Sequence, residues 1–190
     1  TPYRWLDLSK LCNALLPKNQ INEIKYFTAL VSARPNDVNQ PVRQQIYIRA
    51  LNTIPNLSVI YGHYLSHVVN MPVAHCSPGQ QKYVDVIKTE EKGSDVNLAT
   101  HMLHDGHLNK YDVAIVISND SDLLEPIKIV RSILGKKVGI VIPNPKLHPS
   151  AILMKNADFI RNIRQSTLQA CQFPPTLTDR HGQFSKPVSW

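Results

Sequence analysis

Short apolar runs alternate along this chain with stretches in which apolar residues recur at helical spacing. Runs of about four to eight apolar, β-branched residues are typical of buried strands, and apolar residues three and four positions apart are typical of amphipathic helices. The predicted strands are residues 24–31, 57–64, 83–87, 112–118, 137–142 and 159–163. The predicted helices are residues 6–16, 42–54, 94–108, 123–134 and 149–155. Between these elements, residues 66–82 contain two prolines and a glycine, which predicts an irregular loop.

This alternation predicts an α/β fold, a Rossmann-like parallel sheet with helices on both faces. Residues 1–164 carry the pattern and are expected to form one domain. After Gln165 the pattern decays into a proline-rich segment, so residues 165–190 are expected to be a flexible tail. In folds of this class, ligands bind just beyond the carboxyl ends of the strands. A functional site is therefore expected among the residues that follow the strands.

Composition and charge narrow the class of protein. The chain has 21 Lys and Arg against 14 Asp and Glu, a net charge of +7, which favours a polyanionic partner such as RNA. Many basic proteins bind no nucleic acid, so this charge needs support from a site. No apolar run approaches the roughly 20 residues that span a bilayer, so no membrane partner is predicted. The three cysteines, Cys12, Cys76 and Cys171, are far apart, which argues against a disulfide framework and predicts a reducing, cytoplasmic location.

Two carboxylates follow the strongest predicted strand. Asp120 and Asp122 lie just beyond residues 112–118, and Pro126 places them before or within the first turn of the next helix. Carboxylates two residues apart on such a turn suit a hard cation, Mg²⁺ or Mn²⁺, which prefers oxygen ligands. The alternative is structural: Asp and Ser are common helix caps, and Asp122 with Glu125 fits a capping box.

A third carboxylate, Asp95, lies in the first turn of the helix that precedes this strand. Ser94 is the expected N-cap, and a negative charge at Asp95 is favoured there by the helix dipole, which is its structural explanation. However, a right-handed crossover places the start of this helix near the sheet edge that carries Asp120. We therefore expect Asp95, Asp120 and Asp122 to converge within reach of one cation or its bound waters.

Residues 88–99 (KTEEKGSDVNLA), residues 118–126 (SNDSDLLEP) and the later Ala157-Asp158-Phe159-Ile160 resemble the NYN domain of the PIN-like nuclease superfamily, in its LabA-like branch. The resemblance covers most of residues 1–164. It implies a PIN-like sheet and metal-dependent hydrolysis of RNA, with Asp95, Asp120 and Asp122 as metal-binding, catalytic positions. Asn119 stands where the family often has glycine, which an asparagine tolerates if its backbone is left-handed.

One element of the family is not matched. The family opens with an apolar strand that ends in an aspartate, whereas this sequence begins Thr1-Pro2-Tyr3-Arg4-Trp5. In the family that strand lies between the strands matched here by residues 24–31 and 113–118. We expect the 190-residue chain to be catalytically incompetent and poorly stable unless this strand is supplied.

The resulting hypothesis is a metal-dependent ribonuclease in which Asp95, Asp120 and Asp122 position Mg²⁺ or Mn²⁺ and thereby activate water. Candidate substrate-binding residues are Ser118, Asn119, Ser121 and Lys92, although Lys92 is equally well explained as a solvated lysine beside two glutamates. Whether the RNA is single-stranded or structured is open, as is self-association. The rival functions are a non-catalytic RNA-binding or regulatory module and, less favoured, a nucleotide-sugar transferase that uses Asp120 and Asp122. A metal cluster at His67, His75 and Cys76 has only weak support.

Overall fold

A computed structural model describes residues 2–77, 79–143 and 150–189. The helical elements are α1 (Leu8–Leu15), α2 (Gln40–Leu51), α3 (Ser94–His107), the 3-10 turn η1 (Ser121–Leu123), α4 (Leu124–Ser132), α5 (Ala151–Asn156) and α6 (Gln165–Ala170). The strands are β1 (Ile24–Ala29), β2 (Leu57–Pro72), β3 (Tyr83–Lys92), β4 (Val113–Ile117), β5 (Lys137–Ile142), β6 (Phe159–Asn162), β7 (Thr176–Asp179) and β8 (Gly182–Ser185). Within the described residues, no helix is long and apolar enough to cross a membrane.

The strands form two three-stranded sheets and a short C-terminal hairpin. In one sheet, β1 pairs in parallel with β2, and β2 pairs antiparallel with β3. In the other, β4, β5 and β6 are parallel in that order. The expected α/β class is confirmed, because helices pack on a parallel sheet whose middle strand, β5, is buried from Val138 to Ile142.

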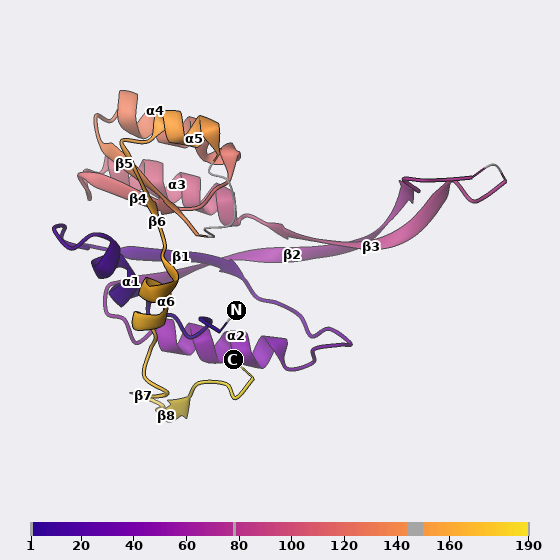
Figure 1. Ribbon diagram of the computed structural model, residues 1–190, viewed down its shortest axis with the longest axis horizontal. Helices are drawn as coiled ribbons and strands as arrows, with labels where there is room; N and C mark the ends of the chain where they lie inside the picture. The colour runs from indigo at the N-terminus through magenta and orange to yellow at the C-terminus, as the bar shows by residue number, and fades with distance from the viewer. Residues whose placement is uncertain (1, 78, 144–149, 190) are drawn as a thin grey trace.

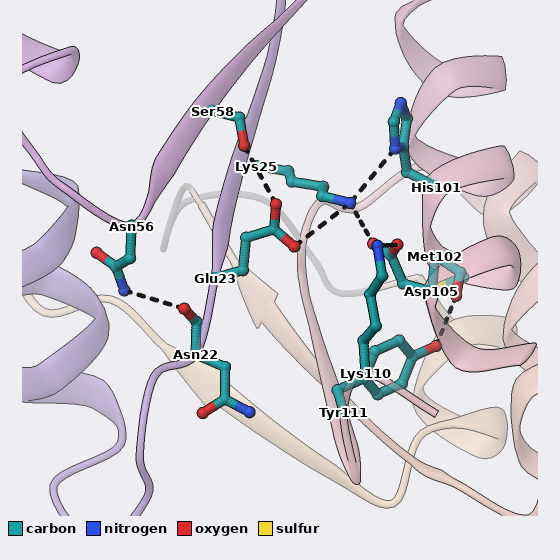
Figure 2. Close-up of polar contacts among 10 residues, drawn as sticks. All are labelled: Asn22, Glu23, Lys25, Asn56, Ser58, His101, Met102, Asp105, Lys110 and Tyr111. Carbon is teal, nitrogen blue, oxygen red and sulfur yellow. Dashed lines mark hydrogen bonds and ion pairs between the residues drawn. The ribbon is translucent and has the colours of Figure 1, made fainter. Parts of the chain in front are cut away.

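Helices on both faces hold the two sheets together (Figure 1). On one face, Met102 of α3 packs into the core of β4, β5, α4 and α5, while His101 of the same helix contacts the Phe27 ring of β1 with centroids 5.8 Å apart. On the other face, Leu8 of α1 packs against both the cluster around Trp5 and the cluster around Val141. An ion pair between Lys25 of β1 and Asp105 of α3 strengthens the first of these links (Figure 2).

The two sheets are not joined through their strands. β1 pairs only with β2, and β4 only with β5, so among the described strands both have a free edge. Burial reflects this: Ile117 of β4 is 37% exposed, whereas Val141 of the equally apolar β5 is fully buried. These two free edges belong to the strands between which the family resemblance places its opening strand.

A long two-stranded arm replaces part of the loop predicted at residues 66–82. β2 continues to Pro72, and β3 extends beyond residue 87 to Lys92, so the expected strand ends were wrong. Ten residue pairs, from His63 opposite Lys92 to Pro72 opposite Tyr83, hold the arm together, and it projects from the body (Figure 1). The backbone of residues 66–72 finds its hydrogen-bonding partners in β3, which the local composition does not reveal.

The predicted C-terminal tail also has structure, contrary to expectation. Residues 165–170 form α6, and β7 and β8 form a hairpin. Phe173 and Phe184 are buried with Trp5, and the Phe173 and Trp5 rings lie 5.7 Å apart. Arg49 of α2 stacks over Phe184 and donates two 2.7 Å hydrogen bonds to Asp179. Isolated aromatic side chains therefore anchor a segment that has no apolar periodicity.

Candidate active site at the carboxyl ends of the strands

The loop between β3 and α3 places Asp95 at the start of its helix. Gly93 is the residue before the helix and has φ 91°, a left-handed conformation that suits glycine. Ser94 is therefore the first helical residue rather than the predicted N-cap, and its hydroxyl donates a hydrogen bond to the Glu91 carboxylate. Asp95 lies in the first helical turn with its side chain exposed. The helix start thus presents two carboxylates, Glu91 and Asp95.

Asp120 and Asp122 follow β4 on a turn that their own backbone groups organise. Asp120 caps η1: its Oδ1 accepts a 3.0 Å hydrogen bond from the Asp122 backbone N–H. The Ser118 hydroxyl accepts a 3.1 Å hydrogen bond from the Asp120 N–H. The cap is therefore Asp120, rather than the box of Asp122 and Glu125 that the sequence suggested. This structural role occupies one oxygen of Asp120 and leaves the Asp122 carboxylate exposed.

Asn119 links this turn to the start of α5. Its side-chain oxygen accepts a 2.8 Å hydrogen bond from the Ser150 backbone N–H. Among the described residues other than glycine, only Asn109 has positive φ, so the left-handed backbone considered for Asn119 is not present. The amide side chain is instead used to join two loops, a role that glycine cannot fill.

The carboxylates at this edge influence one another electrostatically. The pKa of Asp95 is raised above its ordinary value, first by partial burial and then by the negative charges of Asp120, Glu91 and Asp122. The negative charges before and at the start of α3 and those after β4 therefore act on one another. Glu91 was not among the predicted site residues. The alternation of side chains along β3 could have indicated Glu91, because it places Glu91 and its neighbour Glu90 on opposite faces of the arm.

A pocket of about 280 Å³ lies at the same edge. Its polar lining comes from the end of β3, the start of α3 and the end of β4, and its apolar lining comes from β1, α3 and β4. The lining residues are Phe27, Glu91, Ser94, Asp95, Leu98, Ile117 and Ser118. Asp95 and Ser118 thus line one pocket, whereas Asp120 and Asp122 are not among its lining residues.

Carboxylate oxygens are the ligands that a hard divalent cation prefers, and the negative charges of Asp120, Glu91 and Asp122 add to partial burial in raising the pKa of Asp95. The distances are less favourable. Among residues 2–77, 79–143 and 150–189, no group of three or more His, Cys, Asp or Glu side chains lies close enough to hold a metal ion. This applies equally to His67, His75 and Cys76 of the arm. The sharing of one cation by Asp95, Asp120 and Asp122 therefore stays a prediction.

Lys92 is engaged away from the pocket. Its Nζ lies 3.2 Å from a Glu90 carboxylate oxygen, and Lys88 pairs with the other oxygen of Glu90 at 2.7 Å. These three residues alternate with Glu91 along β3, so they lie on the opposite face of the arm. Ser121 is exposed at the start of η1. Of the predicted phosphate contacts, Ser118 is the one that lines the pocket.

Comparison with known proteins extends this description. The model of the NYN domain family matches residues 2–163. The chain belongs to the NYN domain family. This is a PIN-like nuclease family. The NYN domain described here is also 30% identical, over 218 aligned residues, to 6-hydroxy-3-succinoylpyridine 3-monooxygenase HspA of Pseudomonas putida (strain DSM 28022 / S16); the alignment spans 100% of this chain and 69% of that protein.

A solved structure shows the same fold. It is a protein of unknown function, VPA0982, from Vibrio parahaemolyticus RIMD 2210633, with a TM-score of 0.54 and 18% sequence identity. The match covers 84% of this chain and 80% of that one. At this identity the likeness supports the fold of the NYN domain and carries no information on its activity.

Proposed function

We propose that this NYN domain cleaves RNA by metal-dependent hydrolysis at the edge where β4 ends and α3 begins. The observation that carries the proposal is the pocket at this edge, which Glu91, Asp95 and Ser118 line. The raised pKa of Asp95 supports it, because the negative charges of Asp120, Glu91 and Asp122 add to the effect of partial burial. Carboxylates gathered in this way favour either a proton or a bound cation. Membership of a PIN-like nuclease family makes the cation the better interpretation.

In this proposal Asp95, Asp120 and Asp122 would hold Mg²⁺ or Mn²⁺, which would supply an activated water and neutralise phosphate charge. Ser118 lies at the pocket wall, where its hydroxyl hydrogen-bonds a phosphate oxygen. Phe27, at the apolar side of the pocket, stacks on a base, an interaction that tolerates any sequence. The net charge of +7 supports binding along the RNA backbone. The three cysteines are free thiols, as suits a reducing cytoplasm.

We further propose that cleavage requires a strand paired with both β1 and β4. Phe27 of β1 and Ile117 of β4 line the pocket from the two strands with free edges, so such a strand would end beside it. In the family resemblance that strand carries an additional aspartate. The test compares the NYN domain with and without an added opening strand, by melting and by Mn²⁺-dependent cleavage. Equal melting temperature and equal cleavage contradict the requirement.

A second candidate is oxidation of a small aromatic ring, supported by the similarity to the HspA monooxygenase. The pocket of about 280 Å³ is near the lower end of ligand pockets, and Phe27, Leu98 and Ile117 give it an apolar side suited to a single ring. The carboxylates at this edge favour metal-dependent RNA hydrolysis over this alternative, because they would repel the succinoyl carboxylate of such a substrate.

The experiment uses purified protein with the opening strand added, Mn²⁺ and end-labelled RNA in single-stranded and hairpin forms. Asp120→Asn is expected to lower cleavage about 100-fold or more, since even residues that only orient metal ligands contribute about 10–100-fold. RNA affinity should stay largely unchanged, because it comes from dispersed Lys and Arg. The matched control is Asp112→Asn, an exposed aspartate before the opposite end of β4, which should cleave normally.

Other outcomes separate the rivals. RNA binding without cleavage by the protein with the added strand identifies a binding module. Turnover of 6-hydroxy-3-succinoylpyridine with oxygen and a reductant identifies a monooxygenase. A thermal shift with nucleotide sugars, without RNA cleavage, identifies the transferase. Undiminished cleavage by Asp120→Asn would show that the nuclease site lies elsewhere.

A further inference from the structure

The arm formed by β2 and β3 is a two-stranded ribbon with no third strand. From His63 to Pro72, β2 no longer pairs with β1. Among the described strands, β3 pairs only with β2. Isolated two-stranded ribbons are at best marginally stable in water. Nevertheless this ribbon exposes large apolar side chains, with Val68 65% and Ile87 78% exposed. A ribbon of this kind is stabilised when a partner covers it.

One face of the ribbon has a pattern that reads the same from both ends. Residues directly opposite each other in an antiparallel pair share a face, so every second pair belongs to it. From the base of the arm to its tip, the pairs on this face are Tyr64–Glu91, Ser66–Thr89, Val68–Ile87, Asn70–Asp85 and Pro72–Tyr83. The order is therefore aromatic, polar, apolar, polar, aromatic, and its centre is the Val68–Ile87 pair.

We propose that this face binds the same face of a second copy of the chain, about a two-fold axis at the Val68–Ile87 pair. This axis lies in the plane of the interface and runs perpendicular to the strands. The second ribbon therefore lies over the first and runs in the opposite direction. Val68 and Ile87 then each meet their own counterpart. The polar pairs Ser66–Thr89 and Asn70–Asp85 lie over each other, and the aromatic ends do likewise. Such self-complementarity is what an isologous interface requires.

Charge supports a second copy over RNA as the occupant. The face carries two acidic residues, Glu91 and Asp85, and no Lys or Arg among its ten residues, so it repels phosphate. In the proposed arrangement Asp85 lies over Thr89 of the second copy, and Glu91 lies over Tyr83. Acidic groups are therefore not placed opposite each other, and Thr89 can donate to the opposing carboxylate. The opposite face of the arm has no such symmetry, because its charges gather at the base and its apolar residues at the tip.

The size of the ribbon sets the expected strength. Ten residues at about 3.4 Å each, across two strands about 4.8 Å apart, give a face of about 330 Å² on each copy, or about 660 Å² in total. This area is below that of stable specific interfaces and suits a weak, transient contact. A reversible dimer with micromolar Kd is therefore expected, rather than an obligate one. The arrangement also lays the tip of each arm over the base of the other, where Glu91 lines the pocket.

Sedimentation velocity from about 1 to 100 µM tests the proposal, a range chosen to bracket a weak interface. The native protein is expected to convert from monomer to dimer. Ile87→Glu places two like charges at the axis and should weaken dimerisation at least about 100-fold. An equimolar mixture of Ile87→Glu and Ile87→Lys should dimerise again, because opposite charges then meet. Val84→Glu, on the other face of the same ribbon, is the matched control and should dimerise normally.

The circular dichroism of each variant must match that of the native protein. A native protein that stays monomeric throughout this range overturns the proposal. So does a dimer that survives Ile87→Glu, or equal loss of dimer in Ile87→Glu and Val84→Glu. Recovery of the dimer by the mixture of oppositely charged variants distinguishes self-contact at Ile87 from a general effect of charge on the arm.

Discussion

A buried ion-pair cluster fastens β1 to α3, and Asp105→Asn should weaken this attachment. Asp105 is 6% exposed, and its Oδ2 accepts a hydrogen bond from Lys25. Its Oδ1 accepts a 3.0 Å hydrogen bond from Lys110. The Lys25 ammonium also lies 3.5 Å from Glu23 and 3.4 Å from the His101 ring (Figure 2). Because α3 carries Asp95 in its first turn, the cluster also fixes one side of the candidate site.

The magnitude follows from the burial of the charges. Removing one partner of a buried pair costs about 3–5 kcal/mol, because the other charge stays buried without compensation. Here Lys25 is 16% exposed and keeps Glu23, while Lys110 is 50% exposed and returns to water. The expected loss for Asp105→Asn is therefore about 3 kcal/mol, at the lower end of that range. For a chain of this size it corresponds to a fall in Tm of about 6–12 °C.

The dependence on pH has a definite sign. Burial opposes ionisation of Asp105, but the hydrogen bonds from Lys25 and Lys110 outweigh it and hold the pKa below its ordinary value. The charged pair therefore stabilises the fold fully above the unfolded-state pKa of about 3.9. This contribution is lost as the pH falls through the lower, folded-state pKa. The stability difference between native protein and Asp105→Asn should shrink correspondingly below about pH 4.

Urea denaturation followed by circular dichroism at pH 7 measures the effect. Glu125→Gln removes an exposed partner of Lys128 and should change stability by less than about 0.5 kcal/mol. The double variant Lys25→Met/Asp105→Leu should recover most of the loss, since replacing a whole buried pair by apolar residues is often neutral. If Asp105→Asn unfolds within about 0.5 kcal/mol of the native protein, as an exposed pair would, the cluster does not hold β1 to α3.

Two further predictions concern packing and the C-terminal hairpin. Gly139→Ala should lower the free energy of unfolding, measured by urea titration, by about 1–3 kcal/mol. The reason is that a Cβ at this position would lie 2.4 Å from the Phe159 ring and 2.9 Å from Ile115. Unchanged stability would mean that Phe159 moves freely. Asp179→Asn breaks the paired hydrogen bonds from Arg49 and should expose the bond after Phe184 to faster chymotrypsin cleavage. Equal cleavage rates for the native and variant proteins would mean that the aromatic anchors suffice.

The sequence predicted the strands of the parallel sheet well. β4 and β5 are continuous apolar runs, and such runs have few alternatives to a place in a parallel sheet. Placing Asp120 at a strand end followed from the apolar run before it and from Pro126 after it. The convergence of Asp95 with Asp120 was argued from a crossover between neighbouring strands, but β3 and β4 belong to different sheets, so that convergence stays a prediction. These predictions depend on chain direction and burial, which a single sequence carries.

The arm and the C-terminal hairpin depend on partners that are distant or polar. Residues 66–72 mix apolar residues with Ser, His and Asn without a regular alternation, and their pairing with β3 is set across the intervening loop. Glu91 was missed for the same reason, since its orientation toward Ser94 is decided by the register of β3. Phe173 and Phe184 are single aromatic residues in polar surroundings, and their burial in the cluster around Trp5, with the hydrogen bonds from Arg49 to Asp179, orders that segment.

The pocket lies between the two strands that have free edges. Phe27 belongs to β1, and Ile117 and Ser118 lie at the end of β4, so the pocket is bounded by the two strands that lack a common neighbour. A strand paired with both would cover Ile117 and bring its last side chain to the pocket beside Asp95. The described residues place no three ligands within reach of one cation. The contribution of such a strand to a metal site beside Asp95 therefore stays part of the proposal, and its test is whether adding that strand raises Mn²⁺-dependent cleavage.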